Sequence, residues 1–371
     1  MAGAGRISIT SGSAIYSSKL WWYDMQNPMQ SSKQNIREAQ FWKRLDPDSE
    51  DVKCSLCHQN CRIRSGKRGI CSVRENQAGR LMTLVYGNLI AANEDPIEKK
   101  PLFHFLPGSL AYSIATVGCN FRCLHCQNAD ISQLPQEGGR IPDNFVPPEE
   151  VVAEAVSRGC QSIAYTYTEP TIFFEYAYDV AVLAHSSELR NVFVSNGYIG
   201  QDAADKIIPL LDGINIDLKG DDEFYRKVCR AKLEPVKGNI ERFWRAGVWV
   251  EVTTLVIPGY NDSVEVLTDI AQFLAGISQD IPWHVSAFYP TYKLRDAPPT
   301  GMESMRRAID IGRRAGLKYV YPGNIRGESE STICPSCGFL LIERGGHRVM
   351  KNSVVEGGCP QCKTAVAGVW S

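Results

Sequence analysis

Cysteine is the residue type whose number and spacing point most directly to chemistry in this chain. Thirteen cysteines occur in 371 residues, and most of them fall into three groups. The groups are Cys54, Cys57, Cys61 and Cys71; Cys119, Cys123 and Cys126; and Cys334, Cys337, Cys359 and Cys362. In a chain of this length, clustered thiols favour metal sites in a reducing compartment over the disulfide framework of a small secreted protein. We therefore expect a cytoplasmic protein, in which the isolated Cys160 and Cys229 are small core residues.

The middle group lies within "GCNFRCLHCQN" and has the spacing Cys-x3-Cys-x2-Cys. Structural zinc sites and closed four-iron clusters each take four protein ligands, so three neighbouring thiolates are one short of either. A cubane held by three cysteines leaves one iron open to an external ligand, which is a reactive arrangement. The alternative is a zinc site completed by His125 or by a residue distant in the sequence.

This spacing, with the ring of His125 directly before the third cysteine, resembles the radical SAM signature, in which that position is usually aromatic. The resemblance implies a [4Fe-4S] cluster on Cys119, Cys123 and Cys126, whose open iron binds the amino and carboxylate groups of S-adenosylmethionine. It also implies reductive cleavage of that cofactor to methionine and a 5′-deoxyadenosyl radical, which abstracts a hydrogen atom. An electron donor such as flavodoxin or ferredoxin would supply the electron.

Further motifs correspond to other parts of the radical SAM pattern. "YTEP" (167–170) stands where the family commonly carries Gly-Gly-Glu-Pro, and "SNG" (195–197) where it places polar groups near the ribose. "IDLKG" is similar to the Asp-Leu-Lys motif of glycyl-radical activating enzymes, and "TTLVIPGYND" resembles the segment beside the adenine. The resemblance implies cofactor contacts from His125, Thr168, Glu169, Ser195, Asn196, Asp217 and Lys219. For Glu169, which would receive the ammonium group, the alternative is a cap on a helix that starts after Pro170.

Longer segments resemble one branch of this superfamily. "LVYGNLIAANEDPIEKKPLFHFLPGSLAYSIATVGCNFRCLHCQN" and the terminal "CPSCGFLLIERGGHRV" and "CPQCKTAVAGVW" are similar to the radical SAM member of the AmmeMemoRadiSam system. The resemblance covers roughly residues 50–371. It implies Memo-type and AMMECR1-type proteins as partners, and the Asp-Leu-Lys element favours a glycyl-radical enzyme as the substrate.

The two four-cysteine groups require separate interpretations. The spacing of the N-terminal group suits either zinc or a second iron–sulfur cluster, and we favour structural zinc because the segment is poor in apolar residues. The C-terminal group consists of two Cys-x2-Cys pairs, which is typical of a zinc ribbon, although a single iron of the rubredoxin type is an alternative. The residues between its pairs alternate around Gly345-Gly346 and predict a β-hairpin.

Between these groups, short β-branched runs alternate with helical stretches, which predicts βα units and a parallel sheet. The expected strands are 112–117, 162–167, 191–195, 213–217, 249–256, 283–288 and 318–321, and the clearest helices are 148–158, 202–211 and 264–274. Asn261-Asp262-Ser263 is a helix start signal. Because a full eight-unit barrel usually needs about 250 residues, we predict an α/β fold with a partial (β/α)6-type barrel. The polar motifs then lie at the carboxyl ends of successive strands, where barrels build active sites.

The organisation follows from these assignments. We expect a flexible tail in residues 1–50, a Cys-rich module in 51–108, the barrel in 109–325 and a zinc-ribbon-like module in 330–371; the tail has weak features of a transit peptide. With 40 basic and 41 acidic residues, the chain has almost no net charge, so no overall positive electrostatic potential attracts it to nucleic acid or to an anionic membrane. The expected function is that of a radical SAM enzyme, and the Asp-Leu-Lys element favours an activase of a glycyl-radical enzyme. The alternatives are radical modification of a small molecule, RNA or protein side chain, or a non-catalytic zinc-binding interaction protein.

Overall fold

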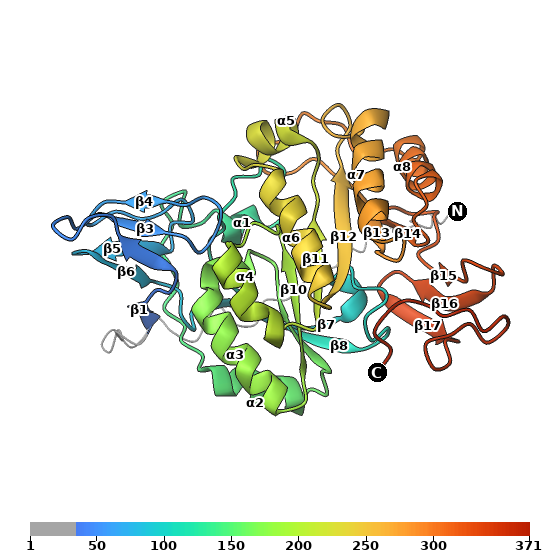
Figure 1. The fold of residues 1–371 in the computed structure, drawn as a ribbon, viewed down its shortest axis with the longest axis horizontal. Helices are drawn as coiled ribbons and strands as arrows, with labels where there is room; N and C mark the ends of the chain where they lie inside the picture. Colours follow the sequence, from blue (N-terminus) through green and yellow to red (C-terminus); the bar gives the residue numbers. More distant parts are fainter. Residues whose placement is uncertain (1–34) are drawn as a thin grey trace, which may run out of the picture. The chain divides into compact units, whose positions relative to one another are not determined.

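The computed structural model describes residues 35–371, and a central sheet of eight strands organises them (Figure 1). Strands β8 to β14 run parallel in sequence order, and β7 pairs antiparallel with β8 at one edge. The strands are β7 (Leu89–Pro96), β8 (Leu110–Thr116), β9 (Ser162–Tyr165), β10 (Arg190–Ser195), β11 (Gly213–Asp217), β12 (Trp249–Val256), β13 (Trp283–Ala287) and β14 (Val320–Gly323). Since β7 and β14 are the two ends of the strand order, the barrel is partial, as predicted.

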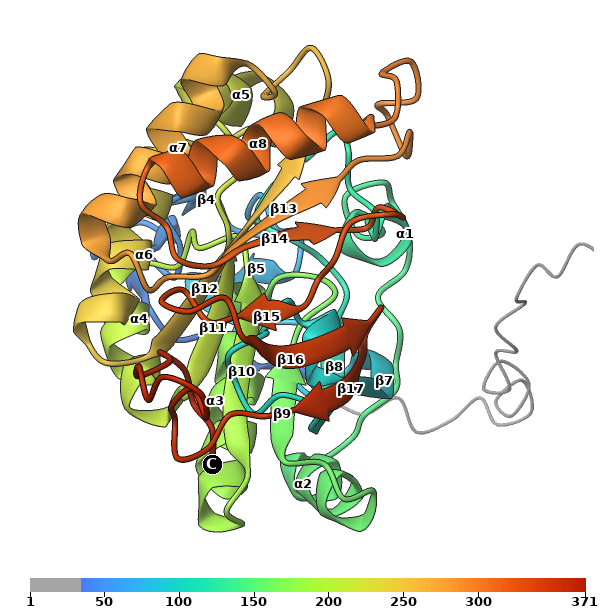
Figure 2. The same ribbon diagram turned by 90° about the vertical axis from the view of Figure 1, so that its right-hand side faces the viewer.

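A helix follows each of the parallel strands β8 to β13, and the helices lie on the outer side of the sheet (Figure 2). They are α2 (Pro148–Ser157), α3 (Phe174–Ser186), α4 (Gln201–Ile207), α6 (Glu234–Arg245), α7 (Val264–Ile277) and α8 (Met302–Arg314). The shorter helical segments are η2 (Ile97–Lys99), α1 (Ala129–Ser132), η3 (Pro170–Phe173), η4 (Ile208–Leu210), α5 (Asp222–Phe224) and the π-helical turn η5 (Tyr225–Cys229).

Local sequence explains where these helices begin and which face they bury. Ser263 caps α7 by accepting a hydrogen bond from the Val266 amide, so the predicted start signal is confirmed. In α6, Val236, Ile240 and Phe243 recur at helical spacing and are all buried against the sheet. The strands they cover are themselves buried, as expected for a parallel sheet between its helices and a filled interior.

The N-terminal module consists of two small three-stranded sheets, with the orders β1-β6-β5 and β2-β3-β4. Its strands are β1 (Arg37–Glu38), β2 (Trp42–Arg44), β3 (Val52–Cys54), β4 (Arg62–Ile63), β5 (Arg74–Gln77) and β6 (Arg80–Thr83). Residues 37–44, which we assigned to the tail, form β1 and β2 and pair with β6 and β3. The boundary predicted at residue 51 is therefore corrected to before residue 37; residues 1–34 of the predicted tail lie outside the described residues.

The C-terminal module is a three-stranded antiparallel sheet, with β15 (Thr332–Ile333), β16 (Leu340–Gly345) and β17 (Arg348–Asn352). The hairpin predicted around Gly345-Gly346 is confirmed, since Gly345 pairs with Arg348 across it. This module shares a small core with the barrel, in which Leu341 and Val366 pack with Phe103 and Tyr321. Within residues 35–371, no helix combines the length and the apolar character needed to cross a membrane.

Candidate functional site

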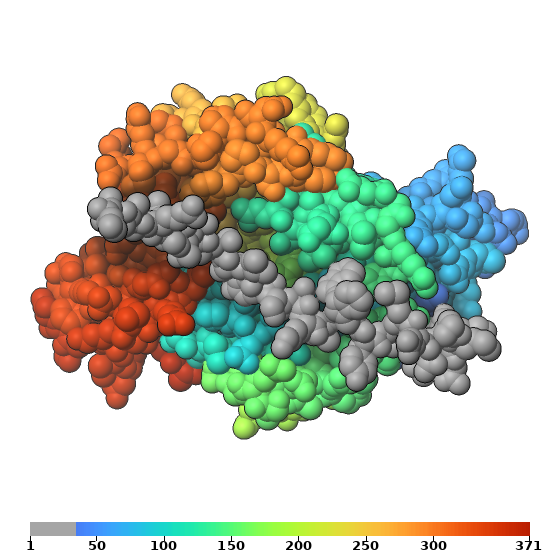
Figure 3. Space-filling model, turned by 180° about the vertical axis from the view of Figure 1, so that it is seen from behind, coloured from blue at the N-terminus to red at the C-terminus, as the bar shows by residue number. Residues whose placement is uncertain are grey.

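A large cavity of about 950 Å³ lies at the carboxyl ends of the parallel strands. Figure 3 shows the surface hollowed between the region of α8 (orange) and the segments around β7 and β8 (cyan to teal). The cavity brings together every residue that the radical SAM resemblance singled out: Cys119, Cys123, His125, Cys126, Thr168, Glu169, Ser195, Asn196, Asp217 and Lys219. The strand register accounts for this convergence, because Asp217 lies opposite Thr253 and Thr253 lies opposite His284.

The three central cysteines come from the loop between β8 and α1. Gly118 starts this loop with a φ of 104°, and a Cβ there would meet Val73 at 2.7 Å, so glycine is required. The amides of Arg122 and Leu124 donate hydrogen bonds to carbonyls of η5, at 3.0 and 3.1 Å, which fixes the loop against the barrel.

The three thiols fit a cluster with an open position better than a closed single-ion site. In residues 35–371, only the C-terminal cysteine group has three or more potential ligand atoms that all lie within 4.8 Å of one another. The sulfurs of Cys119, Cys123 and Cys126 do not meet this criterion and are therefore farther apart. Burial raises the pKa of Cys119 and of Cys126, so thiolates here require a compensating cation. His125 is buried with a pKa lowered to about 3 by desolvation and by Lys219, so its imidazole is neutral.

Glu169 is the cap of η3 and also a link between two strand ends. Its carboxylate accepts hydrogen bonds from the Thr171 amide (3.1 Å), the Thr171 hydroxyl (2.5 Å), the Ser195 hydroxyl (2.9 Å) and the Asn196 amide (2.8 Å). The alternative interpretation of Glu169 as a helix cap is thus confirmed. The carboxylate also lines the cavity, and burial raises its pKa while these donors oppose the shift.

The backbone before Glu169 has the shape that glycine would give it. Tyr167 stands where the resembled family commonly has glycine, and it adopts a φ of 61°, in the left-handed region that glycine favours. Its carbonyl accepts a hydrogen bond from the Asn128 side chain at 2.6 Å, and its hydroxyl donates to Asp95. Thr168 is fixed by a 2.8 Å bond from its hydroxyl to the Thr116 carbonyl.

Two further side-chain pairs lie near the cysteine loop, and one of them connects the loop to the end of β10. The Asn196 side-chain amide donates to the Asn120 side chain at 2.7 Å and lies 3.8 Å from the Cys119 sulfur. At the end of β11, Lys219 Nζ contacts the Asp217 carboxylate at 2.6 Å. These side chains place one amide and one ammonium group beside the cysteines.

The cavity is also lined by polar residues outside the radical SAM motifs. Lys100 is buried, forms a 2.7 Å ion pair with Asp95 and has a pKa lowered by burial to about 8. The His284 ring lies 2.6 Å from the Glu251 carboxylate and also lines the cavity. Arg326 and His347 also line the cavity, and only the tertiary fold brings them to it.

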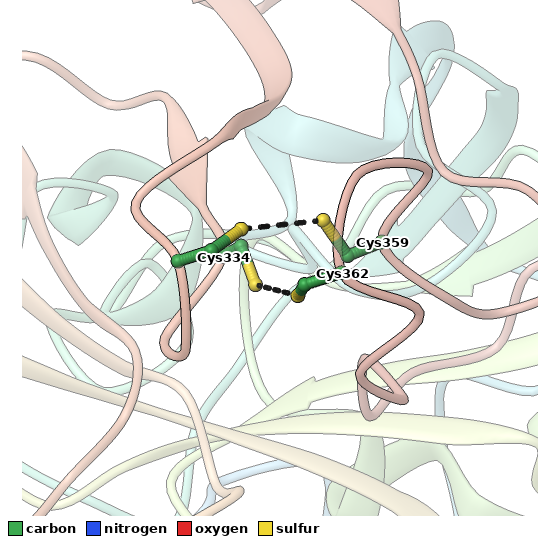
Figure 4. Close-up of side chains that lie close together, drawn as sticks. Cys334, Cys359 and Cys362 are labelled. Atoms are coloured by element: carbon green, nitrogen blue, oxygen red, sulfur yellow. Dashed lines mark hydrogen bonds between the residues drawn. The ribbon is translucent and has the colours of Figure 1, made fainter.

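The four C-terminal cysteines form a compact site (Figure 4). The sulfurs of Cys334 and Cys362 are 3.6 Å apart, and those of Cys337 and Cys359 are 3.7 Å apart. A zinc–sulfur bond of about 2.3 Å gives a tetrahedron whose edges are about 3.8 Å, so these separations suit one tetrahedral ion. Cys54, Cys57, Cys61 and Cys71 line a second, much smaller cavity. The isolated Cys160 and Cys229 are buried in the core, as predicted.

Comparisons with known proteins agree with this site. The family model described as the radical SAM superfamily matches residues 113–271. The uncharacterized protein MJ0808 of Methanocaldococcus jannaschii is 47% identical over 311 residues, covering 83% of this chain and 92% of that protein. A domain of pyruvate-formate lyase-activating enzyme from Bacteroides vulgatus is 19% identical, with 44% of this chain and 99% of that chain covered and a TM-score of 0.39. Streptococcus suis SuiB bound to precursor peptide SuiA is 13% identical, with 62% and 52% covered and a TM-score of 0.46. On the family match and the convergence of its motif residues on one cavity, the chain belongs to the radical SAM superfamily.

Proposed function

We propose that this protein is an enzyme that uses Cys119, Cys123 and Cys126 to hold a [4Fe-4S] cluster and that binds S-adenosylmethionine beside it. The observation that carries this proposal is the shared cavity of about 950 Å³, which the three thiols and all seven predicted cofactor contacts line. When bound, the cluster supplies the electron that cleaves S-adenosylmethionine to methionine and a 5′-deoxyadenosyl radical.

The chain's own residues bind and orient the cofactor. Glu169 holds the Ser195 hydroxyl and the Asn196 amide in fixed positions at the end of β10, where the cofactor's ribose is expected. The Asp217 carboxylate, balanced by Lys219, is a hydrogen-bond acceptor on the neighbouring strand. Because these groups are held before any ligand arrives, binding loses little free energy to ordering of side chains.

We further propose that the protein is the radical SAM member of the AmmeMemoRadiSam system, with Memo-type and AMMECR1-type partners and a flavodoxin or ferredoxin as the electron donor. The support is the sequence resemblance over roughly residues 50–371. We also assign zinc to the C-terminal four-cysteine site, supported by sulfur separations of 3.6 and 3.7 Å. Thiolate chemistry of this kind operates in a reducing compartment such as the cytoplasm.

Two substrate classes have specific support. The Asp217-Leu218-Lys219 element favours a glycyl-radical enzyme, whose backbone would lose the hydrogen atom. The polar side chains of Lys100 and His284 in the lining of the cavity favour a small polar substrate instead. Hydrogen transfer from a deuterated candidate into 5′-deoxyadenosine distinguishes the two classes.

The central test is cleavage of S-adenosylmethionine by the anaerobically reconstituted protein with dithionite. Cys123→Ala is expected to abolish formation of 5′-deoxyadenosine, whereas Cys160→Ala, which removes a buried thiol outside the cavity, is expected to retain it. Cleavage at the wild-type rate by the Cys123 variant would refute the assignment. A wild-type protein that takes up zinc but no iron would instead be a zinc-binding interaction protein.

A further inference from the structure

The N-terminal four-cysteine group forms a site of its own, separate from the large cavity. Cys54 ends β3, Cys61 precedes β4, and Cys57 and Cys71 lie in the turns of the same module. All four line one small cavity, which measures about 20 Å³ for the centre of a water-sized sphere. One water molecule requires about 10–15 Å³ by this measure, so the cysteines surround a small void with room for about one water molecule.

The spacing of these sulfurs contrasts with that of the C-terminal group in the same protein. The C-terminal sulfurs all lie within 4.8 Å of one another, and no three of the N-terminal sulfurs in the described chain meet that criterion. A single zinc ion draws its four sulfurs to about 3.8 Å, because each bonds the same atom at about 2.3 Å. In a four-iron cluster each cysteine binds a different iron, so the sulfurs surround a wider space.

The walls of this void also suit an iron–sulfur cluster. Leu56, Ile63, Ile70 and Ile172 supply an apolar lining, which excludes water from the centre. The Ile70 amide lies 3.5 Å from the Cys61 sulfur. Arg74, which is buried, lies 3.7 Å from the Cys54 sulfur and offsets part of the thiolate charge. Hydrogen bonds to sulfur and a dry shell are the features that stabilise such clusters and set their potentials.

The void lies directly beside the loop that carries Cys119. Asn120 lines the void, and its side chain accepts the hydrogen bond from Asn196 described above. The carbonyl of Cys71 lies 3.1 Å from the position that a Cβ of Gly118 would occupy. The two cysteine groups are therefore separated by little more than the backbone of residues 118–120.

We infer that Cys54, Cys57, Cys61 and Cys71 bind a second, closed [4Fe-4S] cluster rather than zinc, and that it is a one-electron centre adjacent to the first. The identity of the site rests on its own geometry; only its role as a neighbour of a reactive cluster rests on the proposed function.

The test separates the two sites in the full-length protein, reconstituted anaerobically with both iron and zinc present. Wild-type protein is expected to hold about eight irons and one zinc per chain. The triple variant C119A/C123A/C126A is expected to keep about four irons, with a reduced-state EPR signal that S-adenosylmethionine does not alter. Cys57→Ala is expected to keep the other four, with a signal that S-adenosylmethionine does alter; Cys160→Ala is the control for loss of a buried thiol.

Each outcome bears on one site. If the triple variant holds two zinc ions and no iron, the inference is overturned while the proposed function stands. A second outcome is that the Cys57 variant loses iron relative to the wild type, the triple variant does not, and S-adenosylmethionine changes the EPR signal of neither the wild type nor the variants. In that case the proposed function fails while the inference stands. Because the triple variant leaves the N-terminal ligands intact, the result does not depend on the folding of the Cys57 variant; Cys61→Ser provides a second substitution in that group.

Discussion

At the scale of single residues, Glu169 accepts four hydrogen bonds: two from Thr171 in its own segment, and two from Ser195 and Asn196, which join the end of β9 to the end of β10. Replacing it with glutamine converts one acceptor oxygen into an NH₂ group, which then faces a donor that it cannot bond. An unsatisfied buried group costs about 1–3 kcal/mol. We expect Glu169→Gln to lower the free energy of unfolding by that amount, measured by chemical denaturation, and also to weaken S-adenosylmethionine binding.

The control for this prediction is Glu154→Gln. Glu154 forms a solvent-exposed ion pair with Arg158, and such pairs contribute little to stability. If the Glu169 variant lost affinity at unchanged stability, the carboxylate would act on the cofactor directly. Loss of stability with unchanged affinity would leave it as a cap alone.

Arg344 predicts a pH dependence of stability. It is buried beside Glu98, with 3.8 Å between Nε and the carboxylate, and it donates to the Phe103 carbonyl at 2.6 Å. Burial raises the pKa of Glu98, while the Gly108 amide and Arg344 oppose that shift. A carboxyl group whose folded pKa is raised destabilises the fold as pH rises through that pKa, because the ionised form is disfavoured.

Arg344→Leu removes the opposing cation and raises the Glu98 pKa further. Its cost is therefore expected to be larger at pH 8, where the carboxyl group is ionised, than at about pH 4.5, near the ordinary pKa of glutamate. Breaking such a buried pair costs about 3–5 kcal/mol when the remaining charge is ionised. Urea unfolding at the two pH values, with zinc content verified, measures the difference. The exposed Arg348→Leu should show no such trend, and an equal cost at both pH values for the Arg344 variant would contradict the mechanism.

At the scale of elements, sequence periodicity identified those strands whose burial is continuous. β11 and β12 occur within their predicted bounds because their β-branched residues are enclosed on both faces. β7 was missed because Asn93, Glu94 and Asp95 make its sequence polar, and it pairs at the sheet edge. β1 and β2 are two or three residues long, so only their tertiary pairing defines them.

In the candidate site, too, some residues carry a signal in the sequence and others are brought in only by the tertiary structure. The sequence identifies Cys119, Cys123 and Cys126 by their spacing, because these candidate ligands lie close together in the chain. Lys100 and His347 carry no such signal, because they reach the cavity from the segment after β7 and from the β16–β17 hairpin. Their roles depend on how the C-terminal module packs against the barrel.

That packing gives a prediction for the C-terminal module. Cys334→Ala removes one ligand of a closed four-sulfur site, and metal binding by such sites is itself folding free energy. We expect loss of bound zinc and faster amide hydrogen exchange throughout β15 to β17, with the barrel cluster retained. Ser336→Ala, an exposed change between the paired cysteines, should keep both zinc and protection. Normal zinc content in the Cys334 variant would exclude a four-sulfur zinc site.

At the scale of the whole molecule, buried contacts tie the N-terminal module to the barrel. Arg74 pairs with Glu175 of α3, and both side chains are almost fully buried. Glu175 also accepts a 2.7 Å hydrogen bond from the Gln40 amide, and the Tyr198 carbonyl accepts one from the His58 amide at 3.0 Å. Residues 35–371 should therefore unfold as one cooperative unit.

Glu175→Gln is expected to separate that unit into two, because Arg74 loses its buried anion at a cost of about 3–5 kcal/mol. Limited proteolysis should then cut within residues 35–83 before the barrel is attacked, and thermal unfolding should show two transitions. Glu150→Gln, an exposed change on α2, is the comparison. A single transition at a lower temperature would mean that the module depends on the barrel for its own folding.

The left-handed backbone of Tyr167 has a consequence for how the site responds to its cofactor. Glycine at this position would leave the loop many conformations in the free protein, which ligand binding would then have to restrict. Tyrosine costs about 1–2 kcal/mol in this conformation, but its bonds to Asn128 and Asp95 hold it there. That entropy is therefore lost during folding rather than on ligand binding, and the strand end that presents Glu169 is already ordered in the free protein.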